Sequence, residues 1–430
     1  MRAKVLLFTC ETWPMAALFA DSLVGAGLEV GALSPSTHPL RSVSSVIFQR
    51  DYQHPLRHAL LAKAIGDMQP SLIIPCDDTA VAVLHEHHAA CGADPAARAR
   101  KALIEQSLGD PAHFEILRKK SDFIAFAKAQ GVQVPTTLAI EDSADLAEKL
   151  RQGSWPKVLK ADGWSGGRGT HVVRSPDEAQ AAYAEIARAR GMAAMVKDSL
   201  RAGSLMPLYR TRIAPDANVT LQTFVPGRPV NRAVICWRGK VIAGRTFEAV
   251  RTMPNNGNAT VVRLRDIPAV DQAVELLVER LGISGVAGFD FMHDDDTGAT
   301  HLLEVNPRAT TACYAAPKDM APLAHAFAAL FPSLASRRAP AAAVRAPRTL
   351  IALFPQEIER DPESAYLVDG DHTVPWHEPA LVEACLRQAT QVTPYEHFTR
   401  LVKRVLSSEP VAVPARRAPL DWMDGALGRR

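Results

Sequence analysis

The chain has 430 residues, too many for one ordinary core, and we expect roughly two to four domains. Apolar residues make up 47% and charged residues 22%, the balance of a soluble globular protein; a formal net charge of +3 without a basic block disfavours nucleic-acid binding. No apolar run reaches the about 18 residues of a membrane span. Six scattered cysteines without a CxxC pair favour reduced thiols in the cytoplasm over a disulfide framework or a zinc site.

Strand and helix signals alternate over roughly the first 110 residues. The apolar run "KVLLF" predicts a strand at 4–8, "LRHALLAKAIGDMQP" a helix that ends at Pro70, and "SLIIPCDD" another strand. This alternation is typical of a parallel α/β layer. No GxGxxG follows the first strand, so the dinucleotide-binding fingerprint is missing.

The middle of the chain predicts an α+β region rich in hairpins. A helix is expected to start at Asp110 with Pro111 and to stop at Gly131, and Pro135 enforces an extended exit. "AVDQAVELLVERLG" is an amphipathic helix, and several strand candidates surround it. The Pro-, Ala- and Arg-rich stretch that follows reads as a linker, and the remainder as mostly helical with a loose tail.

A glycine-rich loop lies between two strand candidates in "VLKADGWSGGRGTHVV". Gly163, Gly166, Gly167 and Gly169 fall within seven residues, and Lys160 precedes them. Glycine lets backbone N–H groups converge on an anion because no Cβ blocks the approach. The loop is therefore a candidate phosphate flap across a hairpin, although a plain flexible turn explains this stretch alone equally well.

Two carboxylates are predicted to face each other in "GFDFMHDDDTGATHLLEVNPR". Alternation puts Gly288, Asp290 and Met292 on one face of a strand, and Leu302, Glu304 and Asn306 on one face of the next. A hairpin centred on Thr297 would place Asp290 directly opposite Glu304, where like charges about 5 Å apart repel. A divalent cation resolves this conflict, and hard oxygen ligands suit Mg²⁺. The alternative is two unrelated carboxylates on a solvated hairpin face.

Two further stretches carry weaker signals. "LQTFVPGRP" is an apolar strand that ends in a Pro-Gly turn, which suits a purine edge but fits a plain strand end better. In "LHEHH", His85 and His88 lie one helical turn apart without an HExxH pattern, so a solvated helix face is favoured over a metal site.

Taken in order, these pieces resemble the ATP-grasp superfamily, in particular its carboxylate–amine ligases. The resemblance spans about Asp110 to Pro317. Its most specific part is "LLEVNPR" with the upstream "GFDF"; "VLKADGWSGGRGTHVV" matches the lid strand and phosphate loop, and "LRKKSDFIAFAKAQGVQVPTT" the helix that opens with a nucleotide-binding lysine.

The resemblance implies a multidomain α/β and α+β architecture. We expect a Rossmann-like pre-ATP-grasp domain at 1–112 and an ATP-grasp domain of two α+β lobes at 113–332, with the lid lobe at about 155–225. A linker at 333–349 and a mostly helical C-terminal extension with a loose tail at 350–430 would follow.

The resemblance also implies roles for single residues. Asp290, Glu304 and Asn306 would hold Mg²⁺, and Arg308 and Lys160 would be catalytic, with Arg308 facing the transferred phosphoryl group. The implied ATP-binding residues are Lys120 (neighbouring Lys119 is the alternative), Lys160, Gly166, Gly167, Gly169, Gln222, Thr223, Phe224 and Val225.

Two departures from the family pattern bear on these roles. Many members carry an acidic ribose ligand shortly after the purine strand, but this chain has Arg228 and Pro229 there. Many ligases carry an arginine just before the first metal carboxylate, where this chain has Gly288. Arg245, Arg251 and Arg263 are the candidates to replace that arginine.

The function that the resemblance implies is a ligase that uses ATP and Mg²⁺, with Mn²⁺ as an alternative metal. It would activate a carboxylate as an acyl phosphate for attack by an amine. A carboxylase that activates bicarbonate and a nucleotide-binding module without turnover are the alternatives. The expected partners are small-molecule acids and amines, with no nucleic acid and no membrane, and the assembly we consider is a homodimer.

Overall fold

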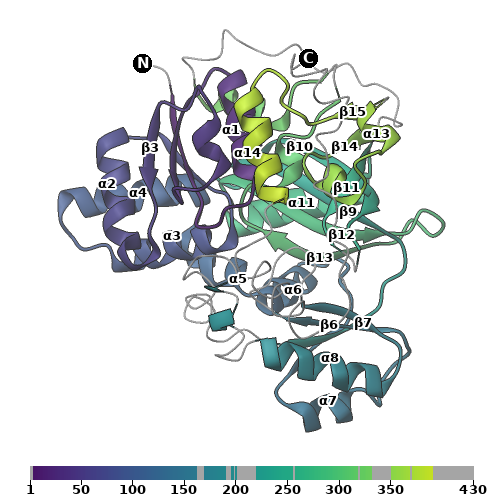
Figure 1. Ribbon diagram of the computed structural model, residues 1–430. Coiled ribbons are helices and arrows are strands. Elements are labelled where there is room, and N and C mark those ends of the chain that lie inside the picture. Colours follow the sequence, from purple (N-terminus) through teal and green to yellow (C-terminus); the bar gives the residue numbers. More distant parts are fainter. Residues whose placement is uncertain are drawn as a thin grey trace, which may run out of the picture.

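The computed structural model contains three β-sheets along one chain (Figure 1). It describes residues 3–161, 169–189, 195–197, 199–200, 219–254, 257–317, 320–331, 350–368 and 370–390. Within these ranges, we find no helix whose length and apolar character would let it cross a membrane. All six cysteines are free thiols, as the sequence predicts.

The N-terminal part is a four-stranded parallel sheet flanked by helices, which confirms the predicted α/β layer. The strand order is β3-β2-β1-β4, so the chain passes from β1 to one side and later returns to the other. Such a switch point opens a crevice at the carboxyl ends of the strands, here of β1 and β4. The elements are β1 (Lys4–Phe8), β2 (Glu29–Ser34), β3 (Phe48–Asp51), β4 (Leu72–Pro75), α1 (Met15–Gly25), α2 (Arg57–Met68), α3 (Asp78–Ala90) and α4 (Pro95–Leu108).

A seven-stranded sheet forms the centre of the molecule, in the order β13-β12-β9-β10-β11-β14-β15. Helix α11 (Pro268–Leu281) covers one face, because Val270, Val274, Leu277 and Leu281 recur at helical spacing and are buried. The strands are β9 (Arg228–Trp237), β10 (Lys240–Thr252), β11 (Ala259–Arg265), β12 (Gly285–His293), β13 (Thr300–Asn306), β14 (Leu350–Ala352) and β15 (Asp371–His372).

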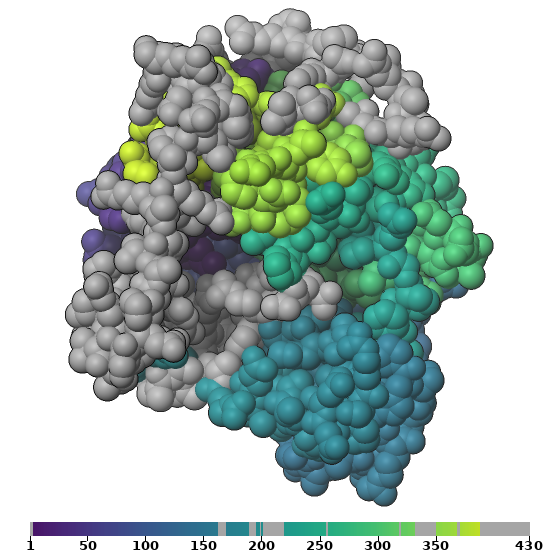
Figure 2. All heavy atoms as spheres, turned by 45° about the vertical axis from the view of Figure 1, so that its right-hand side comes forward, coloured from purple at the N-terminus to yellow at the C-terminus, as the bar shows by residue number. Residues whose placement is uncertain are grey.

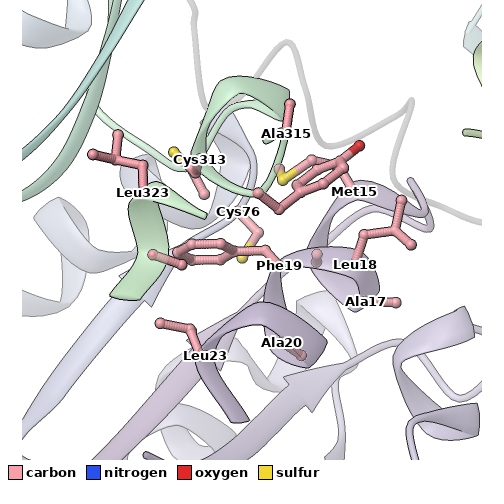
Figure 3. Packing of buried hydrophobic residues seen from close by; sticks show 14 of the residues in the cluster. Met15, Ala17, Leu18, Phe19, Ala20, Leu23, Cys76, Cys313, Ala315 and Leu323 are labelled. Carbon is pink, nitrogen blue, oxygen red and sulfur yellow. The ribbon is translucent and has the colours of Figure 1, made fainter. Parts of the chain in front are cut away.

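The opposite face of this sheet shares one core with the N-terminal sheet and the C-terminal extension. Figure 3 shows side chains of α1, Phe19 among them, facing Cys313 and Leu323 from the segment that follows β13. Phe19 also meets Phe327 edge-on, with ring centroids 6.4 Å apart. Because parts distant in sequence bury their apolar side chains together, the end of β13 is fixed against the N-terminal sheet.

A smaller antiparallel sheet, in the order β5-β8-β6-β7, forms a lobe that projects from the rest of the molecule (Figure 2). Its own core is built from residues such as Leu146, Leu159 and Leu221. The predicted strand–loop–strand is confirmed, since β6 and β7 pair antiparallel. The elements are β5 (Thr137–Ile140), β6 (Lys157–Ala161), β7 (Thr170–Val173), β8 (Val219–Thr223), α7 (Ser143–Lys149) and α8 (Pro176–Ala189).

The helix predicted between Asp110 and Gly131 is broken. A 3-10 turn at Pro111–His113 leads into α5 (Phe114–Arg118), and a separate helix α6 (Lys120–Ala129) follows. Lys119 between them is extended, with φ −104° and ψ 112°. The helical periodicity continues through this residue, so the sequence alone predicts one helix. The break makes Lys120 the first residue of α6.

The described part of the C-terminal extension contains α12 (Gln356–Arg360), α13 (Ala365–Val368) and α14 (Pro379–Thr390). Its mainly helical character agrees with the prediction. The strands β14 and β15 were not predicted, because runs of three and two residues are too short for an alternation to be read. The predicted linker at 333–349 and the tail from Glu409 lie outside the described residues.

The histidines of "LHEHH" are not on a solvated face, so that interpretation was wrong. His87 and His88 are buried, His88 lies 2.8 Å from the Glu105 carboxylate, and His85 stacks on Phe114 with ring centroids 4.2 Å apart. Because histidine is polar, the sequence pattern did not indicate that this face of α3 packs against α4 and α5.

Candidate active site

The predicted pairing of two carboxylates is confirmed: Asp290 on β12 lies directly opposite Glu304 on β13. The turn between the strands closes with a bond from Asp294 N to Ala299 O of 2.9 Å. One detail was wrong. A bulge leaves Leu303 without a direct partner, so Leu302 pairs with Phe291 and lies in the core with Val305 rather than on the face of Glu304.

The two carboxylates differ in their partners and in their charge. Asp290 accepts hydrogen bonds from the amides of Asn231 (2.6 Å) and Asn306 (2.8 Å). Burial, together with the charge of Glu304, raises the pKa of Asp290 to about 7. Burial also opposes ionisation of Glu304, but Lys120 and Lys160 outweigh it and lower its pKa to about 2. The negative charge of the pair is therefore held on Glu304.

Lys120 is the lysine of its neighbouring pair that reaches the site. Its Nζ lies 2.6 Å from Glu304 Oε2, whereas Lys119 pairs with Glu115 at 3.8 Å. The break between α5 and α6 produces this choice, since it starts a new helix at Lys120. Sequence analysis had favoured Lys120 and left Lys119 open.

Lys160 approaches Glu304 from the projecting lobe, on strand β6. Its strand pairs with β7 at Thr170 and with β8 at Thr220. Gly169 closes the base of this hairpin: its carbonyl accepts from Ala161 N at 2.9 Å, and its φ of +73° favours glycine. Gly163, Gly166 and Gly167 lie outside the described residues.

Arg308 follows the hairpin and is buried, with 7% of its surface exposed. Its guanidinium donates to Asn306 Oδ1 (3.1 Å) and to Ala309 O (3.2 Å). It also pairs with Asp78, the first residue of α3 in the N-terminal part, through Nε (2.7 Å) and Nη2 (3.2 Å). Burial opposes this charge, but Asp78 outweighs burial and raises the pKa of Arg308.

Asp78 and Asn231 contact site residues and were both missed by the sequence analysis. A signal for Asp78 existed, because "PCDD" puts two carboxylates at the carboxyl end of a parallel strand, where α/β sheets bind ligands. Asn231 lies in the middle of β9. Asn231 is recognised as a site residue only because it pairs with Asp290 on the neighbouring strand. The sequence does not give the register between β9 and β12.

The residues predicted to border adenine lie at the end of β8 and just after it. Gln222 is buried and donates to Thr137 Oγ1 at 3.0 Å, Thr223 is exposed, and Phe224 and Val225 are half-buried. They lead from the lobe into β9, between two sheets. Arg228, which stands where many relatives carry an acidic ribose ligand, is paired with Glu248 at 3.2 Å. Their roles toward a nucleotide stay predictions.

The structure explains why glycine precedes Asp290. A Cβ on Gly288 would lie 2.5 Å from Thr310 Cγ2, so an arginine does not fit there. Of the three candidate replacements, Arg263 pairs with Glu248 at 3.5 Å and Arg251 lies over the Tyr366 ring at 5.0 Å. Arg245 donates to Ala321 O at 2.8 Å and to Ala315 O at 3.3 Å. None of these contacts reaches Asp290.

The facing carboxylates fit a Mg²⁺ ion in their chemistry. Two carboxyl groups face each other as oxygen donors, and such sites need only one or two carboxylates because substrate phosphates complete the coordination. Larger groups of His, Cys, Asp or Glu with metal-binding geometry do not occur among the described residues. The Asn306 oxygen accepts from Arg308 and its nitrogen donates to Asp290, so the hydrogen bonds do not mark Asn306 as a ligand.

Comparisons with known proteins agree with this geometry. A family model described as an ATP-grasp domain matches residues 118–312. The fold is similar to the biotin carboxylase domain of Hydrogenobacter thermophilus 2-oxoglutarate carboxylase, solved with MgADP, ADP and bicarbonate (15% identity, 72% of this chain and 65% of that chain, TM-score 0.51). The chain thus spans just under two thirds of that protein. A search of curated proteins finds no match.

Two further structures are similar. One is N5-carboxyaminoimidazole synthetase from Staphylococcus aureus with ADP (13% identity, 72% of each chain, TM-score 0.50). The other is N5-carboxyaminoimidazole synthase from Aspergillus clavatus with ADP and 5-aminoimidazole ribonucleotide (13% identity, 73% of this chain and 71% of that chain, TM-score 0.50). At these identities the likeness concerns the fold. The family match identifies an ATP-grasp domain at residues 118–312, and the similar structures share its fold.

Proposed function

We propose that this protein is a ligase that uses ATP and Mg²⁺ to join a carboxylate to an amine through an acyl phosphate. The observation that carries the proposal is the facing pair Asp290 and Glu304 with Lys120, Lys160 and Arg308 around it. A cluster of cations beside two oxygen ligands suits the phosphates of a nucleotide. The similar structures that were solved with ADP add support for a nucleotide.

In the proposed reaction, an oxygen of the substrate carboxylate attacks the γ-phosphorus of ATP, and ADP leaves. The amine nitrogen then attacks the acyl carbon, and phosphate leaves with one oxygen of the original carboxylate. Bound Mg²⁺, held by Asp290 and Glu304, would neutralise phosphate charge. In phosphoryl transfer, the protein contributes mainly by positioning the reactants and by neutralising charge.

The residues of this chain have separate tasks in that scheme. Lys160 and Lys120 come from different parts of the fold and both influence Glu304, which supports a role for each in contacting a phosphate. Asn231 and Asn306 orient Asp290 by donating to its two oxygens. Arg308 is buried and positively charged, which suits stabilisation of the transferred phosphoryl group. Gly166, Gly167 and Gly169 would close over the phosphates, and Gln222 to Val225 would border adenine.

We also propose the domain limits given by the resemblance, namely 1–112, 113–332 with its lid lobe at about 155–225, 333–349 and 350–430. Three separate sheets and the lobe of Figure 2 support them. Small-molecule acids and amines as substrates and a cytoplasmic location belong to the same proposal. The free thiols among the buried cysteines support the location.

The proposal is tested by incubating the protein with ATP, Mg²⁺ and a pool of amino acids as both acid and amine. ADP and phosphate should accumulate. With hydroxylamine in place of the amine, the right carboxylate should yield a hydroxamate. Formation of AMP and pyrophosphate would contradict the acyl phosphate, ADP release that requires bicarbonate would favour a carboxylase, and nucleotide binding without turnover would favour a non-catalytic module.

A further inference from the structure

Arg308, the residue proposed to stabilise the phosphoryl group, is held by a carboxylate that lies 230 positions earlier in the sequence. Asp78 Oδ1 accepts from its Nε at 2.7 Å and Oδ2 from its Nη2 at 3.2 Å. Two parallel bonds between a guanidinium and a carboxylate fix orientation as well as charge. The side chain of Arg308 is 8% exposed, whereas that of Asp78 is 53% exposed. The arginine side chain is therefore buried, and the carboxylate that pairs with it is partly exposed at the surface.

The position of Asp78 is itself fixed by its neighbour. Asp77 caps α3, accepting from Ala80 N at 2.7 Å. Its other oxygen accepts from Thr9 Oγ1 (2.8 Å) and Cys10 N (2.7 Å), which follow strand β1. One carboxylate thus ties the start of α3 to the end of β1, and the next presents its side chain to Arg308. Both lie at the switch point between β1 and β4.

The bonds of Arg308 leave one donor for another group. A guanidinium has five N–H donors. Four of them are used: Nε and Nη2 bond Asp78, Nη2 also bonds Asn306, and Nη1 bonds Ala309 O. Among the described residues, the second N–H of Nη1 has no partner within hydrogen-bond distance. The guanidinium is thus oriented before any substrate binds.

From this geometry we propose that Asp78 is a positioning residue, which acts on the reaction through Arg308 and not on the substrate. The inference rests on the proposed function of Arg308. Without the Asp78 carboxylate, the Arg308 cation is free to turn toward the other carboxylates that influence it, Asp77 and Glu304. The remaining N–H of Nη1, which is proposed to bind the phosphoryl group, would then point in another direction.

The test compares Asp78→Asn with the unaltered protein and repeats the comparison in an Arg308→Ala background. Asp78→Asn should lower kcat about 10- to 100-fold with the KM for ATP nearly unchanged, because misplacing a group by about 1 Å has that effect. In the Arg308→Ala background it should have almost no further effect. Asp78→Glu should recover part of the activity. An equal loss in both backgrounds, or a loss seen in KM alone, would overturn the inference.

A matched control separates positioning from docking of the N-terminal part. Asp21 lies 2.8 Å from His377, so Asp21→Asn weakens another contact between the N-terminal part and the C-terminal extension, away from the site. It should leave kcat unchanged. An equal loss of kcat in Asp21→Asn would show that docking, and not Arg308, is what Asp78 provides.

A measurement of unfolding keeps this inference distinct from the proposed function. If the protein releases no ADP with any acid, the ligase proposal fails, but the pairing of Asp78 and Arg308 is still measurable. The effects of Asp78→Asn and Arg308→Ala on the free energy of unfolding should then be strongly non-additive, since the two residues share one contact. Additive effects would show that they do not act as a pair.

Discussion

Two pairs of carboxylates lie near Arg308, and they differ in almost every respect. Asp290 and Glu304 are on facing strands, so their side chains point to the same face and their charges conflict. Asp77 and Asp78 are consecutive in the chain, so their side chains diverge, one toward β1 and the other toward Arg308. In the first pair the two carboxyl groups face each other, whereas in the second pair each carboxylate binds its own separate protein donors.

The difference separates a site that takes ligands from a frame that supports it. Asp77 accepts hydrogen bonds from backbone N–H groups and a hydroxyl, the arrangement of a structural cap. Asp290 is instead held by two amides and faces a second carboxylate. Burial raises the pKa of both Asp77 and Asp290, so the facing Glu304 is what distinguishes Asp290. Removing a charge from Asp290 or Glu304 should therefore mainly reduce turnover. Removing a charge from Asp77 or Asp78 should instead act through the stability of the fold or through the position of Arg308.

The largest effect is expected for Glu304→Gln. It removes the charge that Lys120 and the proposed Mg²⁺ share, so turnover should fall by at least about 10³-fold while the fold persists. The measurement is ADP release beside a melting curve. Asp296→Asn, an exposed carboxylate in the turn of the same hairpin, is the control and should keep full activity. A fully active Glu304→Gln protein would contradict the assignment of the hairpin as the Mg²⁺ and ATP site.

Arg308→Ala should come next, with a loss of about 10²-fold or more in ADP release and hydroxamate formation alike. Both products should fall together, because Arg308 is proposed to stabilise the phosphoryl transfer that precedes them. A variant that keeps ADP release but loses hydroxamate would instead place Arg308 in the second step. Its Asp78 partner would then serve the amine and not the phosphoryl group.

The contact between helix α4 of the N-terminal part and the start of β12 can be tested through stability. Gly109 has φ +108°, and a Cβ there would lie 2.2 Å from Gly282 O, so Gly109→Ala should lower the free energy of unfolding by about 3 kcal/mol. Gly298 in the hairpin turn has φ +72° with no atom within 4 Å of its Cβ position, so Gly298→Ala should lower it by only about 1 kcal/mol. Denaturant unfolding measures both; equal losses would show that the close backbone approach at Gly109 has no effect.

A pH effect on stability is expected at His38, which caps the 3-10 turn Pro39–Ser42 after β2. Burial lowers the pKa of His38 from 6.5 to about 3, and its ring lies 3.0 Å from Trp13 O and accepts from Leu40 N at 2.9 Å. The unfolded chain binds a proton below about pH 6.5 that the native state refuses, so stability should fall as the pH drops from 6.5 toward 3. His38→Asn should reduce this slope by up to about 1.4 kcal/mol per pH unit. An unchanged slope between pH 6.5 and 4 would contradict the assignment.

The hairpin could be predicted because its information is local. Alternation and a turn signal fix which residues of two neighbouring strands face each other, and that was enough to pair Asp290 with Glu304. The bulge at Leu303 was not foreseen, since nothing in the alternation marks an extra residue. Asp78 meets Arg308 across 230 positions of the chain, and no local pattern encodes that contact. The break at Lys119 likewise is not marked by any loss of helix propensity in the sequence.

The most direct test of the acyl phosphate follows one oxygen atom. The carboxylate that supports hydroxamate formation is labelled with ¹⁸O and incubated with ATP, Mg²⁺ and its amine. Phosphate leaves with a carboxylate oxygen in the proposed reaction, so one ¹⁸O atom should appear in the inorganic phosphate for each product formed. ADP should be the only nucleotide product. The label in AMP, or inorganic phosphate free of ¹⁸O, would contradict the account.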